Sequence, residues 1–311
     1  MPIEHASVQA MRKPWGVSDL QPWSSVDGTT DAVGELWFER ADGNAPTPAL
    51  LLKLLFTSAP LSIQVHPDDT FARAMGMPNG KSEAWYIISA EPGAQIGVGL
   101  NRRITPQELR AAITNGSIVD LVQWRSVAKG DVIFIPAGTI HALGAGIVLA
   151  EIQQRSDTTF RLFDYGRARE LHIDNGVAVA DVFPLRPPRH PVSLTLERTV
   201  LVASQHFVLE RLELPAGSSW ALLADLGNLG FRARRPCGDR IGRAIYRGGD
   251  LRRRRPRQHR SRCQRVDRPG RVSRKRSDRL LLHRLSGRST RPVQAVAADL
   301  AELTGLAEAH A

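Results

Sequence analysis

Short apolar runs separated by turn residues fill residues 34–152, and they constrain the fold more than any other feature of the chain. Branched and apolar side chains in short runs favour strands, and the Gly, Pro, Asn and Asp residues between the runs favour turns. Many short strands joined in this way are typical of a barrel or a sandwich. We therefore predict a mainly β fold with strands over residues 34–40, 49–56, 61–67, 83–89, 131–136 and 147–152.

One helix is expected among these strands. Thr105 suits the N-cap, Pro106 the first helical position and Glu108 the third, which together form a capping box. The apolar pattern that follows ends at Asn115 and Gly116, which are common where helices stop. The sequence thus predicts a small helical insertion near residues 105–115.

The length of 311 residues allows two domains. Four prolines lie within residues 184–191, a density typical of a linker. Strand-like alternation returns over residues 206–217. We therefore expect one domain over residues 1–188 and a second β domain over residues 189–311.

Charge is distributed very unevenly along the chain, whose net charge is +11. Residues 231–293 hold 23 basic and four acidic residues, a net charge of +19, whereas the remainder has a net charge of −8. Residues 228–291 have almost no strand or helix period and too few apolar residues to bury a core. Beyond them, residues 293–306 have the pattern of a short amphipathic helix.

Three interpretations of residues 228–293 remain open. The segment is a frameshifted stretch of a GC-rich coding sequence, a disordered basic arm that binds nucleic acid or another polyanion, or a divergent folded domain. We favour the frameshift, because both cysteines, Cys237 and Cys263, lie only here. A nucleic-acid partner is therefore not expected despite the basic charge.

The remaining composition excludes several classes of protein. Two cysteines are too few for a disulfide scaffold or a cysteine-ligated zinc site. No run approaches the roughly 20 apolar residues of a membrane span, and the N-terminus has no apolar core of the signal-peptide type. We expect a cytoplasmic protein with no membrane partner, and the sequence does not indicate an oligomeric state.

Four polar side chains in or after apolar strands suggest a metal site. Strand alternation places Gln64 and His66 on one face, with Ile63 on the other. Glu83 opens another expected strand, and His141 follows a strand that ends in a Pro-Gly turn. Two imidazoles, a carboxylate and an amide oxygen suit zinc or a similar divalent cation, with a coordination position left open for catalysis.

Further charged residues accompany this set. Lys81 shares a strand face with Glu83, Glu151 lies on the last expected strand of the series, and Arg161 follows it. The two cations suit an anionic ligand or developing negative charge.

Simpler roles for these residues compete with the metal site. Each histidine, His66 or His141, can be a hydrogen-bonded structural residue. Glu83 can pair with Lys81 alone, and Arg161 can pair with a nearby aspartate, Asp157 or Asp164.

Several motifs in a fixed order make the set specific. The run from Gly130 to His141 resembles the second motif of the cupin superfamily, and the chain also contains QVHPDD, GKSEAWY, PAGTIHALGAG and EIQQRSDTTFRLFDYGR. Together these motifs resemble type I mannose-6-phosphate isomerase in its short bacterial form. The resemblance runs from about Lys13 to Arg167 and continues more weakly to about residue 220.

The resemblance implies cupin double-stranded β-helix (jelly-roll) barrels: a catalytic cupin domain over residues 1–188, and a second cupin-like domain over residues 189–311 that is disrupted at 228–293. It implies a zinc-dependent aldose–ketose isomerase that interconverts mannose 6-phosphate and fructose 6-phosphate through a cis-enediol. One Zn²⁺ per chain would be held by Gln64, His66, Glu83 and His141. The catalytic and sugar-phosphate-binding residues would be Lys81, Glu151 and Arg161.

Three other functions remain open. The chain is a related cupin isomerase that acts on a different sugar phosphate, it is a non-catalytic cupin that binds a sugar phosphate, or it binds polyanions through its arginine-rich segment. The presence of Lys81, Glu151 and Arg161 beside the candidate metal ligands favours the enzyme.

Overall fold

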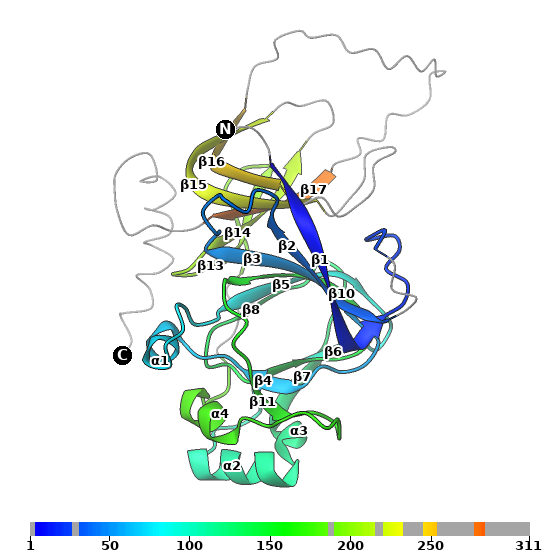
Figure 1. Ribbon diagram of the computed structural model, residues 1–311, viewed down its shortest axis with the longest axis vertical. Helices are drawn as coiled ribbons and strands as arrows, with labels where there is room; N and C mark the ends of the chain where they lie inside the picture. The colour runs from blue at the N-terminus through cyan, green and yellow to red at the C-terminus, as the bar shows by residue number, and fades with distance from the viewer. Residues whose placement is uncertain are drawn as a thin grey trace.

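The computed structural model describes residues 4–26, 31–185, 190–214, 220–232, 245–253 and 277–283, and it is mainly β as predicted (Figure 1). Strands form one twelve-stranded and one five-stranded sheet. The larger sheet has the order β12-β13-β14-β17-β15-β16-β1-β2-β3-β10-β5-β8, and the smaller has the order β11-β4-β9-β6-β7. In chain order the strands are β1 (Glu4–Val17), β2 (Val33–Arg40), β3 (Leu50–Thr57), β4 (Ile63–Val65), β5 (Glu83–Ala90), β6 (Gln95–Leu100), β7 (Val122–Ser126), β8 (Val132–Ile135), β9 (His141–Leu143), β10 (Ile147–Gln154), β11 (Phe160–Phe163), β12 (Val192–Ser193), β13 (Arg198–Ala203), β14 (Val208–Leu214), β15 (Trp220–Arg232), β16 (Ile245–Arg253) and β17 (Ser277–His283).

A barrel forms where strands β1, β2, β3, β10, β5 and β8 face the smaller sheet (Figure 1). Its interior holds an apolar cluster that includes Leu55, Trp85, Ile96 and Leu149. This packing confirms the predicted cupin barrel. Because side chains alternate along a strand, every other residue of the inner strands points into the barrel.

Four helices accompany the barrel in the described part of the chain: α1 (Asp69–Ala74), α2 (Pro106–Asn115), α3 (Ile118–Leu121) and α4 (Ile173–Val179). Helices α2, α3 and α4 lie at the outer face of the smaller sheet (Figure 1), over a core that contains Ile63, Leu109 and Leu162. The predicted capping box of α2 is present, since Thr105 accepts from Glu108 N and Glu108 accepts from Thr105 N. The expected helical insertion is therefore confirmed.

All six strands predicted between residues 34 and 152 are present as β2, β3, β4, β5, β8 and β10. The sequence did not predict β1, β6, β7, β9 and β11. The expected linker falls between α4 and β12, and its residues 186–189 lie outside the described chain. Among the described residues no helix has the length and apolar character needed to cross a membrane.

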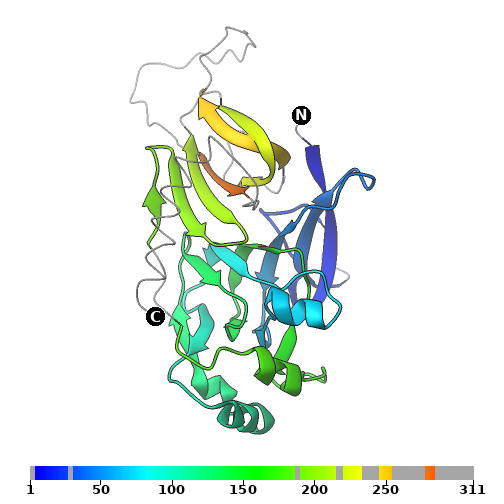
Figure 2. The same ribbon diagram turned by 90° about the vertical axis from the view of Figure 1, so that its left-hand side faces the viewer.

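The second half of the chain continues the larger sheet. Strand β16 pairs with β1, so the strands after residue 190 and those of the barrel form one sheet. Leu201, Phe207 and Leu209 pack in the same core as Phe38 and Leu52, on the outer face of the barrel strands. Figure 2 shows the strands around residues 198–214 beside the barrel. The division at residue 188 remains a prediction.

The expectation of almost no strand or helix over residues 228–291 is wrong for β16 and β17. Strand β17 contains Leu280, Leu281 and Leu282 and pairs with both β14 and β15. Backbone pairing to neighbouring strands stabilises such segments even where the local side-chain pattern is poor. Cys237, Cys263 and the expected helix over residues 293–306 lie outside the described residues, so the three interpretations of the segment stay predictions.

Candidate metal centre and adjoining pocket

His66, Glu83 and His141 form a fully buried cluster whose candidate ligand atoms all lie within 4.8 Å of one another. They come from three places in the fold: His66 directly follows β4, Glu83 begins β5 and His141 begins β9. Gln64 and His141 are register partners across β4 and β9. The barrel thus brings together residues that lie up to 75 positions apart in the sequence.

Both imidazole rings are fixed by backbone carbonyls. The Nδ1 atom of His66 lies 2.8 Å from the carbonyl oxygen of Thr158, and Nδ1 of His141 lies 2.8 Å from that of Thr139. Since a carbonyl oxygen only accepts, each Nδ1 carries the proton and each Nε2 keeps a lone pair. Each Nε2 lies 3.5 Å from an oxygen of Glu83.

The charge states of the cluster suit a cation. Burial, with the nearby Lys81 ammonium, lowers the pKa of His66 to about 3, and burial also lowers the pKa of His141. Burial would raise the pKa of Glu83, but Lys81 and the two histidines hold that pKa well below its usual range. Two neutral imidazoles and a carboxylate therefore direct lone pairs toward the same small space, where a cation could bind them.

These residues fit zinc, which takes imidazole nitrogen and carboxylate oxygen. Deprotonated ligands with hydrogen bonds behind them are what such a site needs. Gln64 lies beside the cluster, with its Nε2 at 3.3 Å from Nε2 of His141 and its Oε1 accepting from Ser62. The amide would have to turn over for its oxygen to serve as a ligand.

A cavity of about 220 Å³ adjoins the cluster inside the barrel. A row of side chains runs across four adjacent strands, and three of its members, Lys53, Glu151 and Trp85, line this cavity. In that row Trp37 of β2 is the register partner of Lys53 of β3, Lys53 is the partner of Glu151 of β10, and Glu151 is the partner of Trp85 of β5. A lysine and a glutamate thus lie side by side between two indoles.

Lys81 and Glu151 connect this wall to the metal cluster. The Lys81 ammonium lies 2.7 Å from Glu83, 3.2 Å from Nε2 of His66 and 3.8 Å from Glu151. Burial and the Glu83 carboxylate raise the pKa of Glu151, although Lys81 and Lys53 oppose that shift. The pairing of Glu83 with Lys81 is present, and it is compatible with a metal site because both histidine Nε2 atoms also face Glu83.

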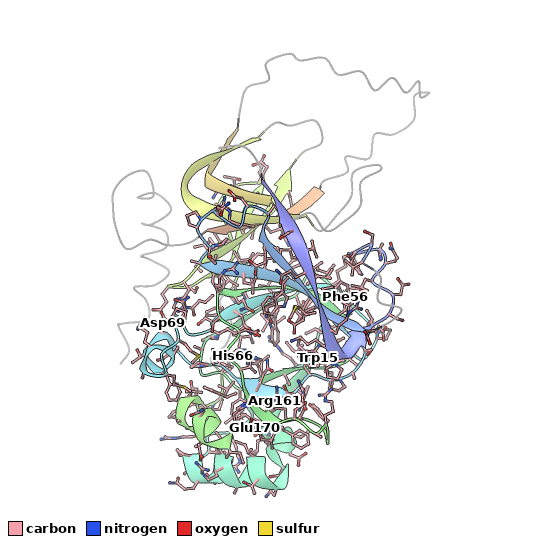
Figure 3. The ribbon with its side chains drawn as sticks, in the orientation of Figure 1. Trp15, Phe56, His66, Asp69, Arg161 and Glu170 are labelled. Atoms are coloured by element: carbon pink, nitrogen blue, oxygen red, sulfur yellow. The ribbon has the colours of Figure 1, made fainter. Side chains whose placement is uncertain are left out.

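Arg161 lies on β11 and lines the same cavity. It does not form the alternative ion pair, because Asp157 contacts Lys53 at 3.2 Å and Asp164 binds Arg167 and Arg169. Its Nη1 donates to the backbone oxygen of Glu170 at 2.7 Å. Figure 3 shows the labelled His66, Trp15 and Arg161 around the barrel interior.

The sequence predicted Lys81, Glu151 and Arg161 in the cavity wall, but it did not predict Lys53 and its carboxylate partners. Lys53 is 2% exposed and lies within reach of Glu35, Glu151 and Asp157 at 3.6, 3.7 and 3.2 Å. A single lysine inside the apolar run LLLKLLFT was the available signal, because a charge in a buried strand needs partners. The aspartate that meets it lies 104 positions away.

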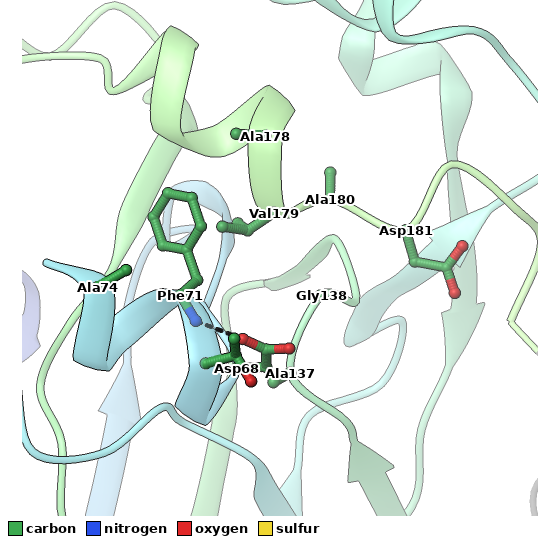
Figure 4. A pocket seen from close by; sticks show the side chains of 10 residues that line it. Asp68, Phe71, Ala74, Ala137, Gly138, Ala178, Val179, Ala180 and Asp181 are labelled. Carbon is green, nitrogen blue, oxygen red and sulfur yellow. Dashed lines mark hydrogen bonds between the residues drawn. The ribbon is translucent and has the colours of Figure 1, made fainter.

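A second cavity, of about 490 Å³, lies between α1, α4 and the turn at Ala137 and Gly138 (Figure 4). Small and apolar side chains dominate its lining. Asp68 is occupied as the N-cap of α1, and Asp181 accepts from the backbone of Phe183. This cavity therefore lacks a cluster of groups suited to chemistry.

The fold and the buried cluster define a cupin barrel with a candidate His–Glu–His metal centre. No family model matches the chain. Two similar curated proteins are the mannose-6-phosphate isomerase of Streptococcus mutans serotype c and the mannose-6-phosphate isomerase ManA of Bacillus subtilis. The first is 38% identical over 197 residues, which is 58% of this chain and 61% of that protein. The second is 38% identical over 181 residues, 55% of this chain and 57% of that protein.

Solved structures agree on the fold. The mannose 6-phosphate isomerase from Bacillus subtilis matches 92% of this chain and 100% of its own, with a TM-score of 0.69 and 22% identity. A zinc-bound mannose 6-phosphate isomerase matches 91% of this chain and 99% of its own, with a TM-score of 0.61 and 13% identity. The resemblance found in the sequence is thus confirmed, while the chain spans only about three fifths of the length of the curated relatives it matches.

Proposed function

We propose that this chain is a mannose-6-phosphate isomerase that interconverts mannose 6-phosphate and fructose 6-phosphate. The observation that carries the proposal is the buried His66–Glu83–His141 cluster with Lys81 and Glu151 beside it in one cavity. The curated relatives bear that name. A binding module for a sugar phosphate has no need of a metal centre with a basic carboxylate next to it.

Zinc is the proposed cofactor, at one ion per chain, held by His66, Glu83 and His141 with Gln64 as the fourth ligand. When bound, the ion supplies a Lewis acid that polarises the carbonyl and hydroxyl oxygens of the open-chain sugar. The lowered pKa values of the two histidines keep both ligands neutral and able to bind it near neutral pH.

Glu151 is the proposed base. Its raised pKa makes the carboxylate a stronger base than an exposed glutamate. In the direction of fructose 6-phosphate, the carboxylate removes the proton from C2 of the open-chain aldose, which gives a cis-enediol. The same carboxyl group returns a proton to C1, while a proton moves from the oxygen on C2 to the oxygen on C1.

Lys81 and Arg161 stabilise the negative charge that develops on the enediol oxygens. Lys81 is buried and already paired with Glu83 and Glu151, so its ammonium is held in place before the substrate arrives. Arg161 presents a guanidinium to the cavity from the opposite sheet.

The test is conversion of mannose 6-phosphate to fructose 6-phosphate by the full chain, before chelation, after chelation and after zinc is restored. We expect activity that disappears with the chelator and returns with zinc. A folded, zinc-loaded chain that binds mannose 6-phosphate without converting it would establish a non-catalytic cupin instead. The cytoplasmic location and the absence of a nucleic-acid partner remain predictions.

A further inference from the structure

A tight turn after β11 folds two arginines back onto one carboxylate. Tyr165 and Gly166 both adopt positive φ, at 54° and 79°, and they reverse the chain after Asp164. The Asp164 carboxylate then accepts from Nε and Nη2 of Arg169 at 2.6 and 2.5 Å, and from Nε of Arg167 at 3.1 Å. A fork–fork pair of this kind fixes the plane of the Arg169 guanidinium.

Arg169 is also held against Trp15. Its Cζ atom lies 5.2 Å from the indole centroid, and the Nζ atom of Lys13 lies 5.5 Å from the same centroid. Gly34 makes this packing possible, since a Cβ there would meet Lys13 Cβ at 2.5 Å and Trp15 Nε1 at 3.0 Å. Arg169 and Lys13 thus both pack against the indole of the buried Trp15, and both line the 220 Å³ cavity.

Several N–H groups of the arginines at this side of the cavity lack a hydrogen-bond acceptor within the described part of the chain. Among the residues that the structure describes, Nη1 of Arg169 and Nη2 of Arg161 have no hydrogen-bond partner, and Nε of Arg161 is buried without one. The other cations of the cavity are different. Lys53 faces three carboxylates and Lys81 faces two, while Lys13 faces one, Glu35, at 3.1 Å. Surplus positive charge therefore gathers at the Arg161–Arg169 side.

We propose that Arg169 and Lys13 form the site that binds the phosphate of the sugar phosphate, with Asp164 and Trp15 as the residues that position Arg169. This inference rests on the proposed function and deepens it, because it assigns the specificity for a phosphorylated over an unphosphorylated sugar. A planar guanidinium with free N–H groups suits phosphate oxygens. The carboxylates of Glu83 and Glu151 repel a phosphate from the metal cluster, which leaves the reacting carbons there.

The experiment uses the full zinc-loaded chain and two probes, inorganic phosphate and mannose 6-phosphate. Phosphate affinity is measured by isothermal titration calorimetry, which does not depend on activity. In R169M we expect the phosphate affinity to fall by at least about tenfold and KM for mannose 6-phosphate to rise by a similar factor, with kcat changed less than about threefold. K13Q is expected to change affinity and KM in the same direction.

R125M is the matched control, because Arg125 is exposed on β7 and has no ion pair among the described residues; it should keep both values of the wild type. R169K keeps the charge without the fork, and it should fold and lie between R169M and the wild type. An active chain whose R169M, R169K and K13Q variants all keep KM and phosphate affinity would overturn the phosphate site and leave the proposed function standing. An inactive chain that binds phosphate only with Arg169 present would support the phosphate site and contradict the proposed function.

Discussion

Lys53 and Glu151 face each other across β3 and β10 with 3.7 Å between Nζ and Oε1. Each of them also contacts a tryptophan on the next strand of the sheet. The Lys53 ammonium lies 4.2 Å from the Trp37 ring centroid, and Trp85 Nε1 donates to Oε2 of Glu151 at 3.1 Å. Both carboxylate oxygens of Glu151 therefore have a defined partner. Glu151 is the proposed proton acceptor, and a group restrained in this way needs little reorganisation when it acts.

Glu151→Gln should reduce kcat for mannose 6-phosphate by at least about a hundredfold, because the amide cannot accept a proton from carbon. Zinc content should stay at the wild-type value, since Glu151 is outside the His–Glu–His cluster. Steady-state kinetics and metal analysis on one preparation check both points. Near-normal turnover with zinc bound would remove Glu151 from the mechanism.

Glu83→Gln should weaken zinc binding by more than about a hundredfold, because loss of even an outer partner of a metal ligand costs tenfold to a hundredfold. The measurement is competition for zinc with a chromophoric chelator. Glu91→Gln is the control, since Glu91 is exposed. If the Glu83 variant kept the zinc affinity of the Glu91 variant, the cluster would not be the metal site.

Lys53→Met should destabilise the fold by about 3 kcal/mol, because two buried carboxylates, Glu35 and Glu151, lose a cation that they share. The free energy of unfolding from urea titration is the readout. The control is Lys129→Met, which changes an exposed lysine. Equal stability of the two variants would show that Lys13 and Lys81 suffice to balance these carboxylates.

Asp164 should make folding stability depend on acid pH. Burial would raise the pKa of this carboxyl, but Arg169 and Arg167 hold it below its ordinary value of 3.8. The stabilisation is therefore complete above that value and is lost as the pH falls through the lower folded-state pKa. We expect the wild type to lose more unfolding free energy than Asp164→Asn between about pH 6 and about pH 3. Parallel losses in the two proteins would contradict the ion pair.

Strand alternation predicted that Gln64 and His66 share a face, whereas the candidate ligand set with Glu83 and His141 also depended on the resemblance of the motifs. Ile63 lies in the outer core while Gln64 and His66 face the barrel interior, as the period of two requires. The sequence could not predict that Lys53 meets Asp157 or that Arg169 meets Trp15, because such pairings depend on how distant strands and turns come together. Local pattern also failed for β17, which is held by its neighbours rather than by its own periodicity.

The layer of strands that carries Lys53 and Glu151 contributes to two different parts of the molecule, one on each face. Its inner surface holds the charged row, while its outer surface, through Leu52, Ile152 and Phe38, is shared with Phe207 and Leu209 of the second half. Phe207 therefore packs against the same two strands, β3 and β10, whose opposite face carries Lys53 and Glu151. Substitutions among the apolar side chains of the second half are therefore constrained by the first half, because those side chains pack against the strands that carry Lys53 and Glu151, the proposed base.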